Sequence, residues 1–194
     1  MFSTVQPMPQ MKQLQSNCSE VLTELLHSDV NLVIWQRDIT SCISDYAAAL
    51  SSFAGLQLVA EPDELNTVLQ QRLPKAEGKA ELIADLELLS QMLCCLMDCT
   101  AVGLRLKRLD KAMCPRFHTD HVAARLLVTY SGPGTEWHSG TSAHSQHSYQ
   151  QIRHGDVAVL KGSGWYGNKD GAIWHRSPQT NQPRLLLSLD PVGE

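Results

Sequence analysis

Three side chains in the second half of the sequence are of types that bind metal ions. His118 and Asp120 stand two residues apart, and His175 follows much later, between Trp174 and Arg176. Successive side chains of an extended strand alternate between its two faces, so His118 and Asp120 are expected to point to the same side. Two neutral imidazoles and one carboxylate on one face of a metal leave the opposite positions open. This is the ligand set of non-haem Fe(II) centres.

A candidate anion-binding residue follows the second histidine. Arg184 stands nine residues beyond His175, at the head of the apolar run 185–189. An arginine on an inward-facing strand position holds a carboxylate bidentately, which suits a dicarboxylate bound at a metal. Ser188 lies four residues after Arg184 and on the same strand face, so it can share that contact. Lys161 and Arg176 are alternative anion-binding residues if Arg184 points outward.

On these residues the chain resembles the Fe(II)/2-oxoglutarate-dependent oxygenase superfamily, within the cupin-like double-stranded β-helix group, over roughly 102–190. The resemblance implies that His118, Asp120 and His175 are the catalytic iron ligands. It also implies that Arg184 holds the far carboxylate of 2-oxoglutarate and that an unknown substrate is hydroxylated. The whole chain is similar to an uncharacterised bacterial domain family, which implies no established activity. The runs that carry this second resemblance are 114–118, 132–137, 155–162 and 175–178.

Two other interpretations of the same residues stay open. The first is a cupin-like protein without redox catalysis that binds zinc or a small anion, for metal homeostasis or sensing; the order of metal affinities alone favours zinc or copper over iron. The second has no metal: Asp120 caps a turn, and the two histidines are hydrogen-bonded barrel residues. In that case Arg184 pairs with a surface carboxylate.

Several other residues are compatible with a site but are better explained as structural. A histidine-containing polar segment, 138–147, predicts a solvated loop with at most an accessory zinc contact. Cysteines on a helix of Leu and Met predict buried apolar side chains. The remaining candidates are a second carboxylate (Glu136), a histidine on the other strand face (His121), a cysteine near the site (Cys114) and an aromatic loop (Trp165 and Tyr166). The histidines of the polar segment are His138, His144 and His147, and the helix cysteines are Cys94, Cys95 and Cys99.

Length and composition predict one globular domain. The chain has 194 residues, of which 43% are hydrophobic and 19% charged, and its formal net charge is −4. No Lys/Arg-rich block is present, so nucleic acid is not an expected partner, and a small molecule is the expected substrate. No apolar run reaches membrane-spanning length, the start lacks a secretion signal, and the six cysteines form no spaced framework. A cytoplasmic protein is therefore expected, with its oligomeric state open.

Periodicity predicts an α+β fold. Residues 1–13 are expected to be flexible, and 14–100 to be mainly helical support with short strands at 31–35 and 56–59. Helices are expected at about 17–26 and 38–50, from Pro62, and after Gly78, where five leucines form one apolar stripe. Residues 101–194 are expected to form a jelly-roll or cupin-like barrel without helices, the double-stranded β-helix. Its strands are predicted at 102–109, 116–120, 124–130, 149–153, 156–161, 172–176 and 184–189.

Overall fold

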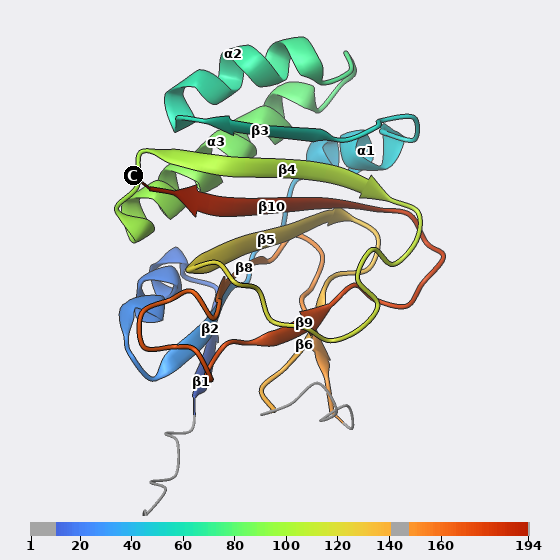
Figure 1. Cartoon of the computed structure of the whole chain (residues 1–194). Coiled ribbons are helices and arrows are strands. Elements are labelled where there is room, and N and C mark those ends of the chain that lie inside the picture. Colours follow the sequence, from blue (N-terminus) through green and yellow to red (C-terminus); the bar gives the residue numbers. More distant parts are fainter. Residues whose placement is uncertain (1–10, 141–147, 194) are drawn as a thin grey trace, which may run out of the picture.

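The computed structural model describes residues 11–140 and 148–193, which form a mixed α/β fold around two β-sheets (Figure 1). The large sheet has the strand order β1-β2-β8-β5-β10-β4-β3, and the small sheet has the order β7-β6-β9. The large-sheet strands are β1 Lys12–Ser16, β2 Val30–Trp35, β3 Leu56–Ala60, β4 Ala101–Leu109, β5 Ala124–Ser131, β8 Val157–Lys161 and β10 Arg184–Val192. The small-sheet strands are β6 Glu136–His138, β7 Gln150–Gln151 and β9 Trp174–Arg176. The helices are η1 Ser19–Leu26 (a 3₁₀ helix), α1 Ser41–Ala49, α2 Pro62–Arg72 and α3 Lys79–Met97.

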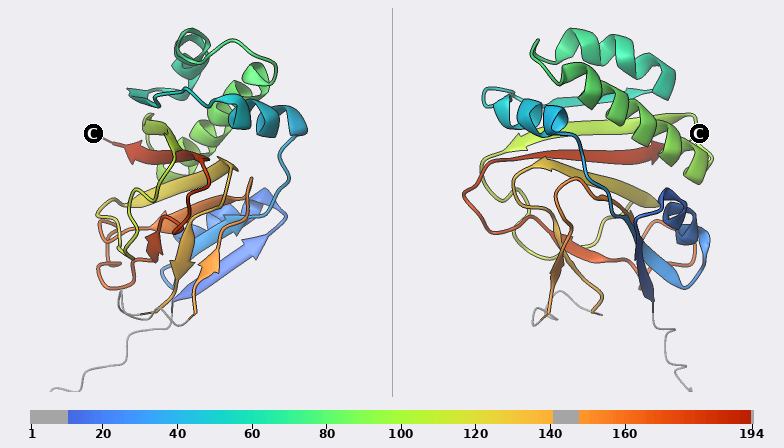
Figure 2. Two further views of the ribbon diagram at one scale, coloured as in Figure 1. Left: turned by 90° about the vertical axis from the view of Figure 1, so that its right-hand side faces the viewer. Right: turned by 180° about the vertical axis from the view of Figure 1, so that it is seen from behind.

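Both faces of the large sheet are covered, and strand β10 shows how the sequence achieves this. Leu185, Leu187 and Leu189 pack with the leucines of the helices in the main core. The alternate residues of β10 point the other way, and Leu186 joins a second core with residues of the small-sheet side. Figure 2 shows the helices on one side of the large sheet and β6 and β9 on the other. The polar residues of β10, which alternate with its leucines, therefore face the space between the two sheets.

Helix α3 matches its prediction. Four of the five striped leucines are at most 1% exposed, and the fifth, Leu96, is partly buried at the packed edge of the core. Gly78 precedes the helix with φ +83°, and a Cβ there would lie 2.1 Å from the carbonyl oxygen of Cys42. The close approach of α1 to the start of α3 therefore requires glycine at this position.

The N-terminal half contributes more than helical support. It supplies three strands of the large sheet, β1, β2 and β3, so the boundary predicted at residue 100 does not separate helices from sheet. Residues 12–16, of which 12 and 13 were predicted to be flexible, form β1 and pair in parallel with β2. Residues 1–10 of that prediction lie outside the described residues. Helix α1 is capped by the hydroxyl of Thr40, which accepts from the backbone N–H of Ile43, and not by Asp38.

The C-terminal half follows the predicted strand order with three corrections. The segment 116–120 forms only an isolated bridge at His118, and the strand predicted at 149–153 is reduced to Gln150–Gln151. The short strand β6 was not predicted. Within 101–140 and 148–193 there is no helix, as predicted. The two sheets face each other as an open sandwich, and the described residues show no closed barrel. No helix in the described part of the chain is both long and apolar enough to cross a bilayer.

Candidate metal centre

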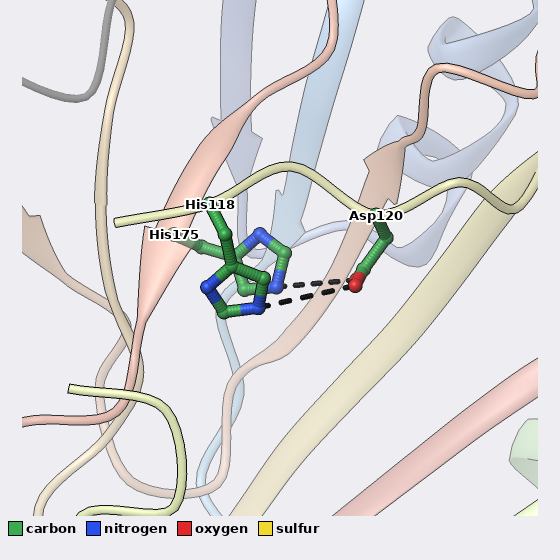
Figure 3. A group of neighbouring side chains, drawn as sticks. All are labelled: His118, Asp120 and His175. Atoms are coloured by element: carbon green, nitrogen blue, oxygen red, sulfur yellow. Dashed lines mark ion pairs between the residues drawn. The ribbon is translucent and has the colours of Figure 1, made fainter. Parts of the chain in front are cut away.

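Backbone pairing brings the two histidines of the predicted triad together. The N–H of His118 donates to the carbonyl of His175 at 3.1 Å, and the N–H of His175 donates back to His118 at 2.9 Å. Residues directly opposite each other in such a bridge have their side chains on the same side. The two imidazole centroids are 4.5 Å apart, and both rings face Asp120 (Figure 3).

The three side chains form a compact set of ligand atoms. Their nearest nitrogen and oxygen atoms all lie within 4.8 Å of one another. Nε2 of His175 is 3.1 Å from Oδ2 of Asp120, and Nε2 of His118 is 4.0 Å from Oδ1. Ligand atoms at about 2.0–2.2 Å from one metal ion stand about 3 Å apart, so the set needs only a small contraction to bind one.

The hydrogen bonds of the two rings turn one nitrogen of each ring toward the carboxylate of Asp120. Nδ1 of His118 lies 3.0 Å from the carbonyl of Arg116, and Nδ1 of His175 lies 3.4 Å from the carbonyl of Ile173. A carbonyl only accepts, so each Nδ1 carries a hydrogen and Nε2 is the nitrogen that each ring turns toward Asp120. Nε2 can reach the carboxylate through its own hydrogen or through a metal ion bound between them. Backbone carbonyls orient histidine ligands of metals in this way.

A close approach of two loops holds Asp120 in place. The carbonyl of Asp120 accepts from the N–H of Ser163 at 2.8 Å and from its hydroxyl at 3.2 Å. The preceding residue, Gly162, has no room for a side chain, because its Cβ would lie 2.1 Å from the carbonyl oxygen of Val122. The loop after β8 therefore fixes the segment that carries the carboxylate.

Arg125 of β5 connects Asp120 to the large sheet. Its Nη1 lies 2.7 Å from Oδ2 of Asp120, while Nε and Nη2 bind the two oxygens of Asp190 at 2.7 and 2.8 Å. Arg105 of β4 adds a further ion pair to Asp190 at 2.8 Å. Burial raises the pKa of the Asp120 carboxyl, but the hydrogen bond and charge of His175, with the charges of Arg125 and His118, outweigh it and lower the pKa to about 2. The carboxylate is thus ionised at neutral pH, as a metal ligand must be.

A cavity of about 350 Å³ opens beside the three ligands. It lies between the inner face of the large sheet and the segment that carries the ligands. Ligand-binding pockets commonly start at about this size. The lining residues are Arg105, Lys107, Met113, Cys114, His118, Asp120, Arg125, Leu127, Thr135, His175, Arg176, Ser177, Arg184, Leu186 and Ser188.

Arg184 and Ser188 are both in this lining, on strand β10. Nη1 of Arg184 donates to the carbonyl of Pro133 at 3.2 Å, while its Nε is buried without a partner, as is the Ser188 hydroxyl. Burial lowers the pKa of Arg184 to about 10, although the nearby charge of Glu136 raises it. Buried donors left unpaired cost about 1–3 kcal/mol each, so this wall is suited to an acceptor-rich anion.

The other candidates lie apart from the three ligands. Glu136, the alternative carboxylate, accepts from Nε of Arg176 at 2.6 Å. His121 bonds the hydroxyl of Ser163, and Lys161 donates to the carbonyl of His27, outside the cavity lining. Of the alternative anion-binding residues, only Arg176 lines the cavity.

The predicted cysteine and histidine groups form no second site in the described residues. Cys95 is exposed, which corrects its prediction as buried, and the thiols of Cys94 and Cys99 are 3.6 Å apart. Burial, then the hydrogen bond and charge of Cys99, raise the pKa of Cys94 to about 12. The ring of His138 stacks on Trp174, while His144 and His147 lie outside the described residues.

The last two candidates, Cys114 and the aromatic loop, lie in different positions relative to the cavity. Cys114 lines the cavity, and its backbone exchanges hydrogen bonds with Ser177. Trp165 packs over Lys161, with the ammonium 4.5 Å from the ring centre, and Tyr166 is fully exposed. Neither aromatic residue lines the cavity, so this loop is not part of the candidate site.

The fold is similar to that of several solved proteins, among them oxygenases. A Shewanella oneidensis protein assigned provisionally as an oxygenase matches with a TM-score of 0.58 and 11% identity, over 95% of this chain and 90% of that chain. A C-terminally truncated protein from Neurospora crassa, solved in apo form, matches with a TM-score of 0.54 and 12% identity, over 98% of each chain. The Arabidopsis thaliana dioxygenase for auxin oxidation, solved with 2-oxoglutarate, matches with a TM-score of 0.50 and 12% identity, over 80% of this chain and 73% of that chain. At these identities the likeness defines the fold alone.

The sequence places the chain in a particular family within that fold. It belongs to the family described as protein of unknown function (DUF1826), whose profile matches residues 16–190. A comparison with curated protein sequences finds no match.

Proposed function

We propose that the protein is a mononuclear non-haem Fe(II) oxygenase that uses 2-oxoglutarate as co-substrate and acts on a small molecule. His118, Asp120 and His175 would hold the iron through Nε2, a carboxylate oxygen and Nε2. A metal ion with only three protein ligands supplies a Lewis acid with open positions for a co-substrate and for oxygen. The oxygenase fold supports this assignment. Of the similar proteins, the Arabidopsis dioxygenase was solved with 2-oxoglutarate and the full-length Neurospora protein with alpha-KG.

The incompletely paired guanidinium of Arg184 carries the proposal. A cupin-like protein that only binds zinc needs the three ligands but has no use for a buried arginine beside them. The side chain of Arg184 is 3% exposed, and no carboxylate in the described residues lies within ion-pair distance of it. A dicarboxylate that chelates the metal with one end would bring its other carboxylate to Arg184 and the hydroxyl of Ser188.

The remaining residues of the cavity would position these groups. Arg125 binds Asp120 from the side of the large sheet, so the carboxylate keeps one orientation while it faces the histidines. Leu127 and Leu186 form an apolar wall between the ion-pair network and Arg184, which excludes water from part of the cavity. In such surroundings, ion pairs to a bound anion are stronger than in water.

The test is an anaerobic titration of the Fe(II)-loaded protein with 2-oxoglutarate, followed by the visible metal-to-ligand absorption band. We expect a saturable band in the wild type and none in His175→Ala. Arg184→Gln should need at least about tenfold more 2-oxoglutarate, because a charged hydrogen bond to the carboxylate is lost. Arg72→Gln, at the exposed end of α2, is the matched control and should titrate like the wild type.

The alternative outcomes separate the competing functions. Tight zinc binding through the same three residues, with no band from iron and 2-oxoglutarate, would indicate a metal-binding protein without redox catalysis. Absence of any bound metal in the wild type would contradict both functions and leave the triad a structural cluster.

A further inference from the structure

The cavity wall carries more positive charge than its own carboxylates balance. Among the described residues, five cationic side chains line the cavity, whereas Asp120 is the single lining carboxylate. Two further carboxylates, Asp190 and Glu136, approach the lining arginines from behind. The cationic residues are Arg105, Lys107, Arg125, Arg176 and Arg184.

Three of these cations are neutralised in place. Arg105 and Arg125 both bind Asp190, and Arg125 also binds Asp120. Arg176 binds Glu136 at 2.6 Å. Lys107 and Arg184 have no ion-pair partner within residues 11–140 and 148–193. One of these, Arg184, is accounted for by the dicarboxylate of the proposed function.

The second free cation, Lys107, stands on the same wall as Arg184 but on the neighbouring strand. In the antiparallel register of β4 and β10, Lys107 lies opposite Leu186, which is the residue between Arg184 and Ser188 on the inner face. Residues opposite each other in a sheet face the same side. Lys107 is half-buried, and its register partner Leu186 is an apolar residue of the cavity lining, as is Met113.

We propose that the substrate of this site is a small organic anion, whose charged group binds at Lys107 while its carbon skeleton contacts Met113, Leu127 and Leu186. This rests on the proposed function, because 2-oxoglutarate is taken to occupy Arg184 and the metal. The five lining cations exceed the three carboxylates Asp120, Asp190 and Glu136 by two charges, and a divalent metal ion raises this excess to four. 2-Oxoglutarate balances two of these charges, so an anionic substrate matches the remaining charge of the cavity better than a neutral or cationic one.

The test compares matched acids and amides on one protein. The protein is loaded with zinc, so that it does not turn over, and is saturated with 2-oxoglutarate. It is then titrated by calorimetry with two acid–amide pairs, benzoate with benzamide and phenylacetate with phenylacetamide. Each pair has one shape and differs in charge. We expect the wild type to bind the better acid at least about tenfold more tightly than its amide. Lys107→Gln should remove that difference, and Lys107→Arg should retain it. Lys111→Gln, an exposed lysine outside the cavity lining, is the control.

The outcomes separate this inference from the function on which it rests. Equal binding of acid and amide, or an acid preference that survives in Lys107→Gln, overturns the anionic-substrate inference even if the 2-oxoglutarate band forms. An acid preference that is lost in Arg184→Gln but kept in Lys107→Gln also overturns it, since the acid then occupies the co-substrate position. If the band is absent in the wild type but the Lys107-dependent preference is present, the oxygenase function fails and the anion site stands.

Discussion

Two arginine–carboxylate clusters lie on opposite faces of the large sheet, and strand β5 contributes to both. On the helix side, Arg37 binds Asp85 of α3 through both terminal nitrogens, and the hydroxyl of Tyr130 donates to the same carboxylate at 2.6 Å. On the cavity side, Arg125 binds Asp120 and Asp190. Arg125 and Tyr130 stand at odd and even positions of one strand, so their side chains leave it on opposite faces.

The two faces of the sheet differ in how completely their buried polar atoms are paired. Each of the three side-chain nitrogens of Arg37 has an acceptor, since Nε donates to the carbonyl of Gly155 and the terminal nitrogens bind Asp85. On the cavity side, Arg184 and Ser188 each keep a buried atom without a partner. A buried network that is satisfied specifies packing, whereas one that is left incomplete on a cavity wall indicates a ligand.

The largest expected effect is on the paired cluster. Asp85→Ala leaves the buried guanidinium of Arg37 without its counter-charge, which typically costs about 3–5 kcal/mol of unfolding free energy. Urea unfolding of the metal-free protein would measure this loss. Gln91→Ala, exposed on the same helix, should change the unfolding free energy by less than about 0.5 kcal/mol. A small effect of Asp85→Ala would remove the distinction between the two clusters.

A smaller effect is expected from Arg125→Lys on the cavity side. Lysine keeps the charge but cannot bind Asp190 bidentately and reach Asp120 at the same time. Loss of such a supporting contact typically lowers metal affinity about 10–100-fold. Competition with a chromophoric chelator would measure the affinity for zinc. Arg105→Lys, which contacts Asp190 and not Asp120, should have a weaker effect, and equal losses in both variants would argue against a positioning role for Arg125.

The third prediction concerns pH and the metal-free protein. Because the pKa of Asp120 is held at about 2, below its ordinary 3.8, the folded state favours the ionised form. The resulting stability is fully present above about pH 4 and is lost as the pH falls toward 2; it is worth roughly 2 kcal/mol. The difference in unfolding free energy between the wild type and Asp120→Asn should therefore shrink between pH 4 and pH 2. A difference that stays constant over this range would mean that the carboxylate is not held in its ion pairs.

Much of this architecture follows from local patterns in the sequence. The leucine stripe predicted α3 and alternation predicted β4, while apolar runs next to turn residues predicted β5, β8 and β10. Each of these signals lies within the element itself. The partners of each strand could not be predicted in this way. Residues 12–16 carry no strong strand pattern and are ordered by parallel pairing with β2, which is a tertiary contact.

The candidate site was predictable to the extent that it depends on residue type. His118, Asp120 and His175 were identified from their chemistry. The prediction that His118 and Asp120 point to the same side assumed a strand at 116–120, and this segment forms only an isolated bridge. Arg125 and Asp190 were missed because they stand in apolar runs that were treated only as strands. Charged residues at alternating positions of such runs are the available signal, since burying them requires a partner. That Arg125 reaches both Asp190 and Asp120 depends on the register of β5 and β10.

The last comparison sets two buried arginines against each other. Arg184→Met replaces an incompletely paired guanidinium by an apolar side chain of similar length. We expect the metal-free and ligand-free protein to gain about 1 kcal/mol of unfolding free energy, because an unpaired buried donor is removed. Arg37→Met should lose stability instead, because it leaves the carboxylate of Asp85 buried with only the hydroxyl of Tyr130.

With saturating 2-oxoglutarate, Arg184→Met should become less stable than the wild type instead of more stable. In the zinc-loaded wild type, 2-oxoglutarate at about 100 times its dissociation constant adds about 2.7 kcal/mol of stability, and the variant should lose most of that gain. Urea midpoints of both proteins, with and without 2-oxoglutarate, would measure both effects. If Arg184→Met destabilises the ligand-free protein as much as Arg37→Met does, Arg184 is a structural residue like its counterpart across the sheet. The incomplete pairing on the cavity wall would then no longer point to a ligand.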